Sequence, residues 1–128
     1  MAAPVQVEHN RVAWIDTDAG GRIHFTCVFR WAEAAETSLF RRFDLFEHWG
    51  AFPRRHVEAE YLAVLVFEDA VEVRLWPDKV GTTSITFAWE ILRGEELCVR
   101  GRPSSPTSTA VCRPAPLPDG IRQALSGG

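Results

Sequence analysis

Two aspartates separated by one residue, Asp16 and Asp18, precede a pair of glycines in the stretch DTDAGG. His24 follows, and the sequence then becomes apolar at helical spacing. A carboxylate near a helix N-terminus stays ionised, and the free N–H groups there can bind a developing negative charge. Such a carboxylate can act as a nucleophile or as a base. Aspartates in this setting also commonly form a turn by accepting hydrogen bonds from nearby N–H groups, so the residues alone leave both interpretations open.

Hydrophobic periodicity predicts the elements that hold this turn. We expect a first strand that ends at Asp16 and a helix over residues 25–43, with apolar side chains nearly all around it. After residue 53 the period changes to two, and VEVRLW, SITFAWEI and the segments beside them predict about four antiparallel strands. Pro103 and Pro106 lack backbone donors, so we expect the last strand to be interrupted there or to lie at an edge.

The order of these elements restricts the fold to an α+β class. A curled antiparallel sheet of about five strands wrapped around one long helix buries that helix, and this layout is the hotdog fold. The length of 128 residues fits a single domain, residues 1–128. We expect residues 113–128, which contain three prolines and end in Gly-Gly, to form a loosely ordered tail with at most a short helix at GIRQAL.

Composition excludes several classes of function. A net charge of −3 gives no general attraction to nucleic acid or to an anionic membrane. The sequence has no apolar run of the ~18 residues that a membrane span needs and no signal-peptide pattern at its start, so we expect a cytoplasmic protein. Cys27, Cys98 and Cys112 lie in apolar segments, which favours buried thiols over disulfides. Metal-binding spacings of histidine or cysteine are missing, so we expect no metal and no cofactor.

The stretch DTDAGGRIHFTCVFRWAEAA resembles the signature of the 4-hydroxybenzoyl-CoA thioesterase-like family of hotdog acyl-CoA thioesterases. That signature is D-x-D-x-x-G, a strand-like stretch, and an aromatic-rich helix with a tryptophan and an acidic residue. The matching residues are Asp16, Asp18, Gly21, Trp31 and Glu33. Farther on, KVGTTSITFAWEI is similar to a strand of the family, with matches at Gly81 and Ser84. Together these matches place the resemblance between residues 10 and 102.

The resemblance implies hydrolysis of an acyl thioester. Asp18 would be the catalytic carboxylate, acting on the thioester carbonyl as nucleophile or as base for water. The backbone N–H of Phe25 would line the oxyanion hole, with Gly21 contributing through close backbone approach. No particular side chain is needed for that role, so a phenylalanine is acceptable there.

A related hotdog subgroup offers a second carboxylate. That subgroup has its catalytic carboxylate on the helix, at the position of Glu33, and a histidine at the position of His24. It also has Gly-Gly after the histidine, where this chain has Phe25 and Thr26. We therefore keep Glu33 as an alternative catalytic carboxylate behind Asp18. His24, Glu33 and, separately, Ser84 are candidates for a place beside the substrate.

Three functions remain open on the sequence. They are hydrolysis of acyl-CoA, hydrolysis of a thioester on acyl carrier protein in fatty-acid or polyketide metabolism, and binding of acyl groups without turnover. The phosphates of CoA favour forked guanidinium contacts and other cations, and we single out Arg54, Arg55 and Lys79 for them. A carrier protein would instead need an electropositive docking surface. One sheet around one helix leaves a strand edge open, so we expect a homodimer or homotetramer.

Overall fold

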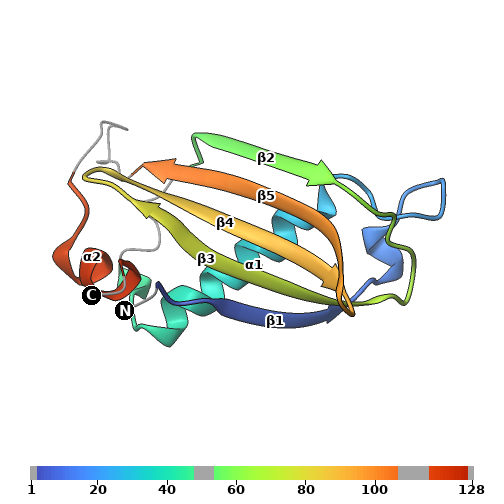
Figure 1. Ribbon diagram of the computed structural model, residues 1–128, viewed down its shortest axis with the longest axis horizontal. Coiled ribbons are helices and arrows are strands. Elements are labelled where there is room, and N and C mark those ends of the chain that lie inside the picture. The colour runs from blue at the N-terminus through green and yellow to red at the C-terminus, as the bar shows by residue number, and fades with distance from the viewer. Residues whose placement is uncertain (1–2, 48–53, 107–115, 127–128) are drawn as a thin grey trace.

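The computed structural model of the chain describes residues 3–47, 54–106 and 116–126. Five antiparallel strands form one sheet in the order β1-β3-β4-β5-β2, and helix α1 crosses one face of it (Figure 1). The elements are β1 (Gln6–Arg11), α1 (Cys27–Arg42), β2 (His56–Tyr61), β3 (Ala70–Val80), β4 (Ser84–Arg93), β5 (Glu96–Pro106) and α2 (Asp119–Leu125). This is the α+β arrangement of five strands and one long helix that the sequence predicts. Neither described helix has the length and apolar character needed to cross a membrane.

Helix α1 is buried on the side that faces the sheet. Val28 and Leu39 are fully buried, whereas Glu33 and Ala34 are exposed. The sequence predicted apolar side chains nearly all around the helix, but the sheet covers only one of its faces (Figure 1). Arg41 and Arg42 occupy the last turn, where cations interact favourably with the helix dipole.

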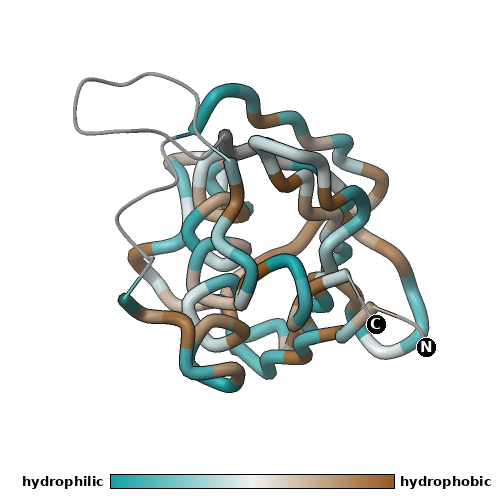
Figure 2. Tube along the Cα trace, turned by 90° about the vertical axis from the view of Figure 1, so that its left-hand side faces the viewer, coloured by the Kyte–Doolittle hydropathy of each residue, from teal (hydrophilic) through white to brown (hydrophobic). Residues whose placement is uncertain are grey.

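The core lies between α1 and the sheet. Buried residues alternate with less buried ones along most of β3, and hydrophobic and hydrophilic segments follow one another along the chain trace (Figure 2). Trp89 of β4 is buried and meets the ring of Phe29 edge-on, with 6.1 Å between ring centroids. Gly101 of β5 pairs with Trp89, and a Cβ atom at Gly101 would lie 2.3 Å from the Trp89 ring. The indole therefore fills the space that a side chain at this position would need.

The first strand ends earlier than predicted. β1 stops at Arg11, and Trp14–Asp16 form a 3-10 turn. The buried carboxylate of Asp16 accepts a hydrogen bond from the Ala13 N–H at 2.8 Å and forms an ion pair with the Arg30 guanidinium at 2.8 Å. Both partners of the Asp16 carboxylate lie outside the sheet, and the chain leaves the sheet at this turn. Asp16 is thus a structural residue of the turn.

The prolines do not end the last strand. β5 continues to Pro106. It lies between β4 and β2 as far as Ser104, and beyond that residue it pairs with β4 alone, so it lies at an edge only at Pro106 and not at Pro103. Its pairing with β4 passes from Thr86↔Ser104 directly to Trp89↔Gly101, although the pairing with β2 continues through Pro103. A proline has no N–H to donate, and the ladder to β4 has its gap at that point.

The described end of the chain packs against the core. Residues 116–126 carry α2, whose Ile121 and Leu125 are fully buried. The Leu117 N–H also donates to the carbonyl of Thr82 at 2.9 Å. The short helix that the sequence allowed at GIRQAL is present, and its apolar face completes the core. Residues 113–115 and 127–128 lie outside the described residues. Cys27 and Cys98 are buried free thiols, as predicted, and Cys112 lies outside the described residues.

Candidate active site

Asp18 lies in a tight turn held by backbone hydrogen bonds. Its N–H donates to the carbonyl of Arg22 at 2.8 Å, and its Oδ1 accepts the Gly20 N–H at 2.7 Å. Gly21 has a φ of +82°, which is in the left-handed region where glycine is favoured. Within the described residues Oδ2 of Asp18 has no hydrogen-bond partner. The turn therefore presents one carboxylate oxygen that is free to act on a bound molecule.

A second turn leads from this loop into α1, and nearly all of its N–H groups are bonded. The Ile23 N–H donates to the Leu65 carbonyl at 3.0 Å, and the His24 N–H to the Asp16 carbonyl at 2.7 Å. The N–H groups of Thr26 and Cys27 donate to Nδ1 and the carbonyl of His24, at 3.2 and 3.0 Å. The Phe25 N–H has no acceptor in the described part of the chain. An unpaired N–H in an otherwise satisfied turn is available to an incoming oxygen.

One cavity joins the two turns. It has a volume of about 340 Å³ and lies where β2 ends and α1 begins, at the same end of the sheet (Figure 1). Its wall is mainly apolar, with one carboxylate and one guanidinium. The lining residues are Asp18, Arg22, Ile23, Phe25, Tyr61, Leu62, Ala63, Val64 and Leu65. The arrangement combines a carboxylate, a backbone donor and space for an apolar group.

The guanidinium of Arg93 is one of several groups that hold the segment 62–69, whose first four residues line the cavity. Arg93 donates to the Val64 carbonyl at 2.9 Å and pairs with Asp69 at 2.9 Å. Asp69 in turn accepts the Val66 N–H at 2.9 Å. That N–H, together with Arg93, holds the pKa of Asp69 below its ordinary value. These contacts tie the wall to the hairpin between β4 and β5.

The other predicted site residues lie outside the cavity. His24 is exposed, with its ring stacked on that of Phe25 at 4.7 Å between centroids. Glu33 is exposed on α1. Ser84 pairs with Pro106, and Lys79 pairs with Thr86. These last pairs lie at the end of the sheet where β2 begins, opposite the end that carries the cavity.

Arg54 and Arg55 are also at that opposite end, just before β2. The guanidinium of Arg54 binds the buried carboxylate of Glu36, whereas Arg55 is exposed. Arg54 therefore already has an anionic partner within the chain. Of the three cations predicted for the CoA phosphates, Arg55 and Lys79 are exposed and form no ion pair with the described residues.

The sequence analysis did not identify three residues: Glu36, which binds Arg54, and Arg22 and Tyr61, which line the cavity. Glu36 is a charged residue on the apolar stripe of α1, and this mismatch was the available signal. Arg22 lies in the cavity beside Asp18, and its place within the DTDAGGR turn was the signal. Tyr61 lines the cavity from β2, but nothing in the local sequence marks it, because the sheet brings it there from far along the chain.

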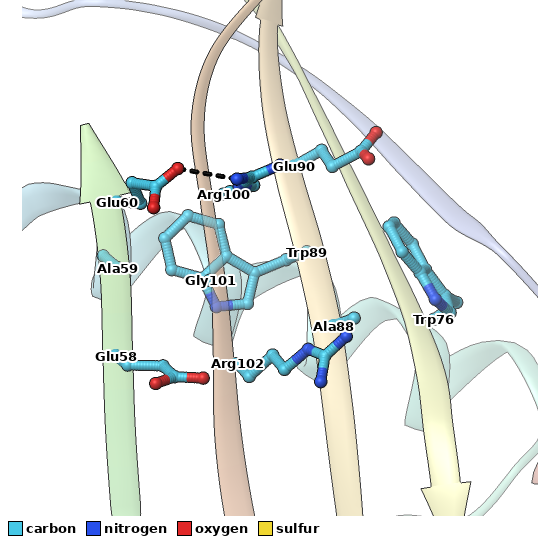
Figure 3. A pocket seen from close by; sticks show the side chains of 10 residues that line it. All are labelled: Glu58, Ala59, Glu60, Trp76, Ala88, Trp89, Glu90, Arg100, Gly101 and Arg102. Carbon is cyan, nitrogen blue, oxygen red and sulfur yellow. Dashed lines mark hydrogen bonds and ion pairs between the residues drawn. The ribbon is translucent and has the colours of Figure 1, made fainter. Parts of the chain in front are cut away.

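A second cavity lies on the outer face of the sheet (Figure 3). It has a volume of about 470 Å³, and charged side chains surround it. Glu60 pairs with Arg100 across it at 2.7 Å. It lies over β3, β4 and β5, whose N–H groups are largely used by the sheet, and over the edge strand β2, and within the described residues it has no turn that directs an N–H group toward a carboxylate. No cluster of three or more His, Cys, Asp or Glu side chains suited to a metal occurs in the described ranges.

Residues 20–105 match the Thioesterase superfamily. The chain belongs to this superfamily. The 1,4-dihydroxy-2-naphthoyl-CoA hydrolase of Synechococcus sp. (strain RCC307) is 29% identical over 121 residues, which cover 86% of this chain and 92% of that protein. The family predicted from the DTDAGG motif is thus confirmed at the level of the superfamily. The named relative is a naphthoyl-CoA hydrolase and not a 4-hydroxybenzoyl-CoA thioesterase.

Solved thioesterase structures share the fold. A 1,4-dihydroxy-2-naphthoyl-CoA thioesterase from Synechocystis has a TM-score of 0.87 at 20% identity, with 97% of both chains covered. A gentisyl-coenzyme A thioesterase has a TM-score of 0.83 at 21% identity, with 95% of this chain and 100% of that chain covered. The predicted hotdog fold is therefore confirmed.

Proposed function

We propose that this protein is an acyl-CoA thioesterase that hydrolyses an aromatic acyl-CoA at the cavity between Asp18 and Phe25. The observation that carries the proposal is that Asp18, with one unpaired carboxylate oxygen, and Phe25, whose N–H is unpaired, both line one mainly apolar cavity. Membership of the thioesterase superfamily supports the reaction. The relatives' names support an aromatic acyl group, as does a cavity of about 340 Å³ lined by Phe25 and Tyr61.

The chemistry requires attack on the thioester carbonyl and stabilisation of the oxyanion that forms. In one route Asp18 removes a proton from water, and the oxygen of that water attacks the carbonyl carbon. The Phe25 N–H binds the resulting oxyanion. Collapse of this intermediate breaks the C–S bond, and the thiolate of CoA takes up the proton held by Asp18. The products are the carboxylic acid and free CoA.

In a second route Asp18 itself attacks the carbonyl carbon and expels the thiolate. Water then hydrolyses the mixed anhydride that has formed on the carboxylate. A single turnover in ¹⁸O-labelled water identifies the second route if label appears in the Asp18 side chain, because water has then opened the anhydride at the aspartyl carbonyl. Label in the acid product alone fits either a base or attack of water on the acyl carbonyl of the anhydride, and trapping of the anhydride by hydroxylamine then distinguishes the two.

The active unit in this proposal is a homodimer joined along β2. β2 is at one edge of the sheet, and its Val57 and Tyr61 are each 44% exposed. Exposed strand edges favour pairing with another strand. A two-fold axis through this edge runs the two β2 strands antiparallel, so the basic end of one copy lies beside the cavity of the other. Arg55 and Lys79 are then the leading candidates for the phosphates of CoA; Arg54 is the third, although it already binds Glu36.

Release of free thiol from a panel of thioesters tests the proposal. The panel contains aromatic and aliphatic acyl-CoAs and the same acyl groups on acyl carrier protein. We expect fastest turnover of aromatic acyl-CoA, and sedimentation at micromolar concentration should show a dimer. Faster turnover of the thioesters on acyl carrier protein would show that the carrier protein, and not CoA, carries the natural substrate. If the protein bound the thioesters but hydrolysed none of them, it would be an acyl-binding protein and not an enzyme.

Substitution of the two carboxylates tests the site. Asp18→Asn retains the shape of the turn but lacks the charged oxygen, so turnover should fall by at least ~100-fold with little change in the thermal midpoint. Glu33→Gln is the matched control and should remain within about twofold of the unmodified protein, since loss of an exposed side chain outside the site changes little. Loss of turnover in Glu33→Gln but not in Asp18→Asn would instead identify Glu33 of α1 as the catalytic carboxylate.

A further inference from the structure

The last residue of β2 reaches the turn that precedes α1. The hydroxyl of Tyr61 donates a hydrogen bond to the carbonyl of Phe25, across a sequence separation of 36 residues. Both residues line the cavity with Asp18. An edge strand is thereby connected to the residue that carries the unpaired N–H.

Two peptide groups flank the Cα atom of Phe25, and their orientations decide where its N–H points. The first carries the Phe25 N–H, and its carbonyl, that of His24, accepts the Cys27 N–H at 3.0 Å. The second carries the Phe25 carbonyl, and its N–H, that of Thr26, donates to His24 Nδ1 at 3.2 Å. The contacts to His24 are local to the turn, whereas Tyr61 holds the second peptide from another element of the fold.

We propose that Tyr61 is a positioning residue for the oxyanion hole: its hydroxyl holds the Phe25 carbonyl in place, so that the Phe25 N–H alone faces the developing negative charge. A carbonyl that rotated toward the cavity would present its own lone pairs to the oxyanion. Donors stabilise an oxyanion only when they are fixed in the geometry of the intermediate. The inference rests on the proposed thioesterase activity, and Tyr61 touches no reacting atom in it.

Tyr61→Phe isolates the hydroxyl, because the ring that lines the cavity is retained. We expect kcat for an aromatic acyl-CoA to fall about tenfold, less than the hundredfold or greater loss on deleting an oxyanion donor. KM should change by less than about twofold, because uniform binding of the substrate is unaffected. Thr37→Val is the matched control, since the Thr37 hydroxyl also donates to a backbone carbonyl, that of Glu33, at 2.9 Å. It should leave kcat unchanged.

A second measurement removes the proton without changing the fold. Tyr61 is the only tyrosine in the sequence, so biosynthetic incorporation of 3,5-difluorotyrosine labels this position alone. Ring fluorination lowers the pKa of a phenol, and a phenolate cannot donate a hydrogen bond. We expect kcat of the labelled protein to fall as pH rises through the titration of its single ¹⁹F resonance. KM should stay constant through that range, and the unlabelled protein should show no such step.

The outcomes separate this inference from the proposed function. An active unmodified protein with an inactive Asp18→Asn variant, but with full kcat in Tyr61→Phe and no step in the labelled protein, overturns only the role of Tyr61. A rise in KM at constant kcat also overturns it, because the hydroxyl would then contact the bound substrate. Absence of thioester hydrolysis in the unmodified protein refutes the proposed function itself. A fall in kcat at constant KM, in step with the ¹⁹F titration, supports the inference.

Discussion

Arg54 binds both carboxylate oxygens of Glu36, with Nη1 to Oε1 at 2.8 Å. The Glu36 residue is only 2% exposed. Burial raises the pKa of Glu36, and the hydrogen bonds and charge of Arg54 oppose that rise. The pair joins the middle of α1 to the segment that leads into β2, and so fixes where the edge strand starts.

Arg54→Met should be strongly destabilising. It leaves a buried carboxylate without its partner, which typically costs about 3–5 kcal/mol in free energy of unfolding. The pKa of Glu36 is already raised by burial, so the variant should regain stability as pH falls toward the ordinary pKa of glutamate, where the carboxyl is protonated. Urea unfolding at pH 7 and pH 5 measures both effects. Arg55→Met is the control and should change stability by no more than about 0.5 kcal/mol; equal losses in the two variants would contradict the prediction.

Gly101→Ala should also be destabilising, for a steric reason. The new Cβ atom would lie 2.3 Å from both the Trp89 ring and the Glu58 carbonyl, and such overpacking typically costs about 1–3 kcal/mol. Gly120→Ala is the matched control, since nothing lies within 4 Å of its Cβ position. Because Gly120 is in α2, alanine there should stabilise by up to about 1 kcal/mol. Thermal unfolding of the two variants should therefore show midpoints that move in opposite directions.

Arg93→Gln should weaken substrate binding more than it slows turnover. The substitution removes the charged contacts that tie the Val64 carbonyl and Asp69 to the β4–β5 hairpin, so the cavity wall loses a fixed position. Loss of about 1 kcal/mol of hydrogen bonding corresponds to roughly a fivefold rise in KM. Steady-state kinetics checks this, with Arg74→Gln as the control because Arg74 pairs with Glu72 on β3, away from the cavity. A fall in kcat at constant KM would show that the wall acts on the chemical step.

Cys27 should be unreactive in the folded protein. Burial, with a smaller contribution from Asp16, raises its pKa to about 12, so the thiolate that reacts with alkylating agents is scarce at pH 8. Iodoacetamide labelling followed by mass spectrometry should modify Cys27 far more slowly in buffer than in urea. The raised pKa also predicts that stability is constant below the ordinary pKa of cysteine and falls as pH rises from there toward 12. Equal labelling rates in buffer and urea would contradict the buried thiol.

The parts of the fold that were predictable are those set by local pattern. The change from a helical period to a period of two around residue 53 separated α1 from β3 and β4, because side-chain burial follows the period of each element. The end of β1 was not predictable in this way. Trp14 and Ile15 look like strand residues, but the Asp16 carboxylate forms a turn there by binding the Ala13 N–H.

The same division applies to the candidate site. Asp18 and Phe25 could be placed near one another because they belong to one short motif just before α1. Tyr61 and the wall at 62–65 come from a distant segment, and only the pairing of β2 with β5 positions them. The binding of Arg54 to Glu36 was equally hidden, since it depends on how the edge strand meets the helix.

The pairing of β2 also sets the order in which the molecule can be assembled. β3, β4 and β5 are joined by short hairpins, but His56 of β2 pairs with Ser104 of β5, so β2 has no strand to join until β5 has been made by the ribosome. Such non-local pairing is slow to form because a long loop must first close. Tyr61 is the last residue of β2 and the cavity wall follows it directly, and so the site takes shape late. A nascent chain that pauses before β5 would therefore hold a formed β3–β4 hairpin but would lack the Cys98 carbonyl, which accepts the N–H groups of Leu62 and Ala63, so the cavity wall would have no fixed place.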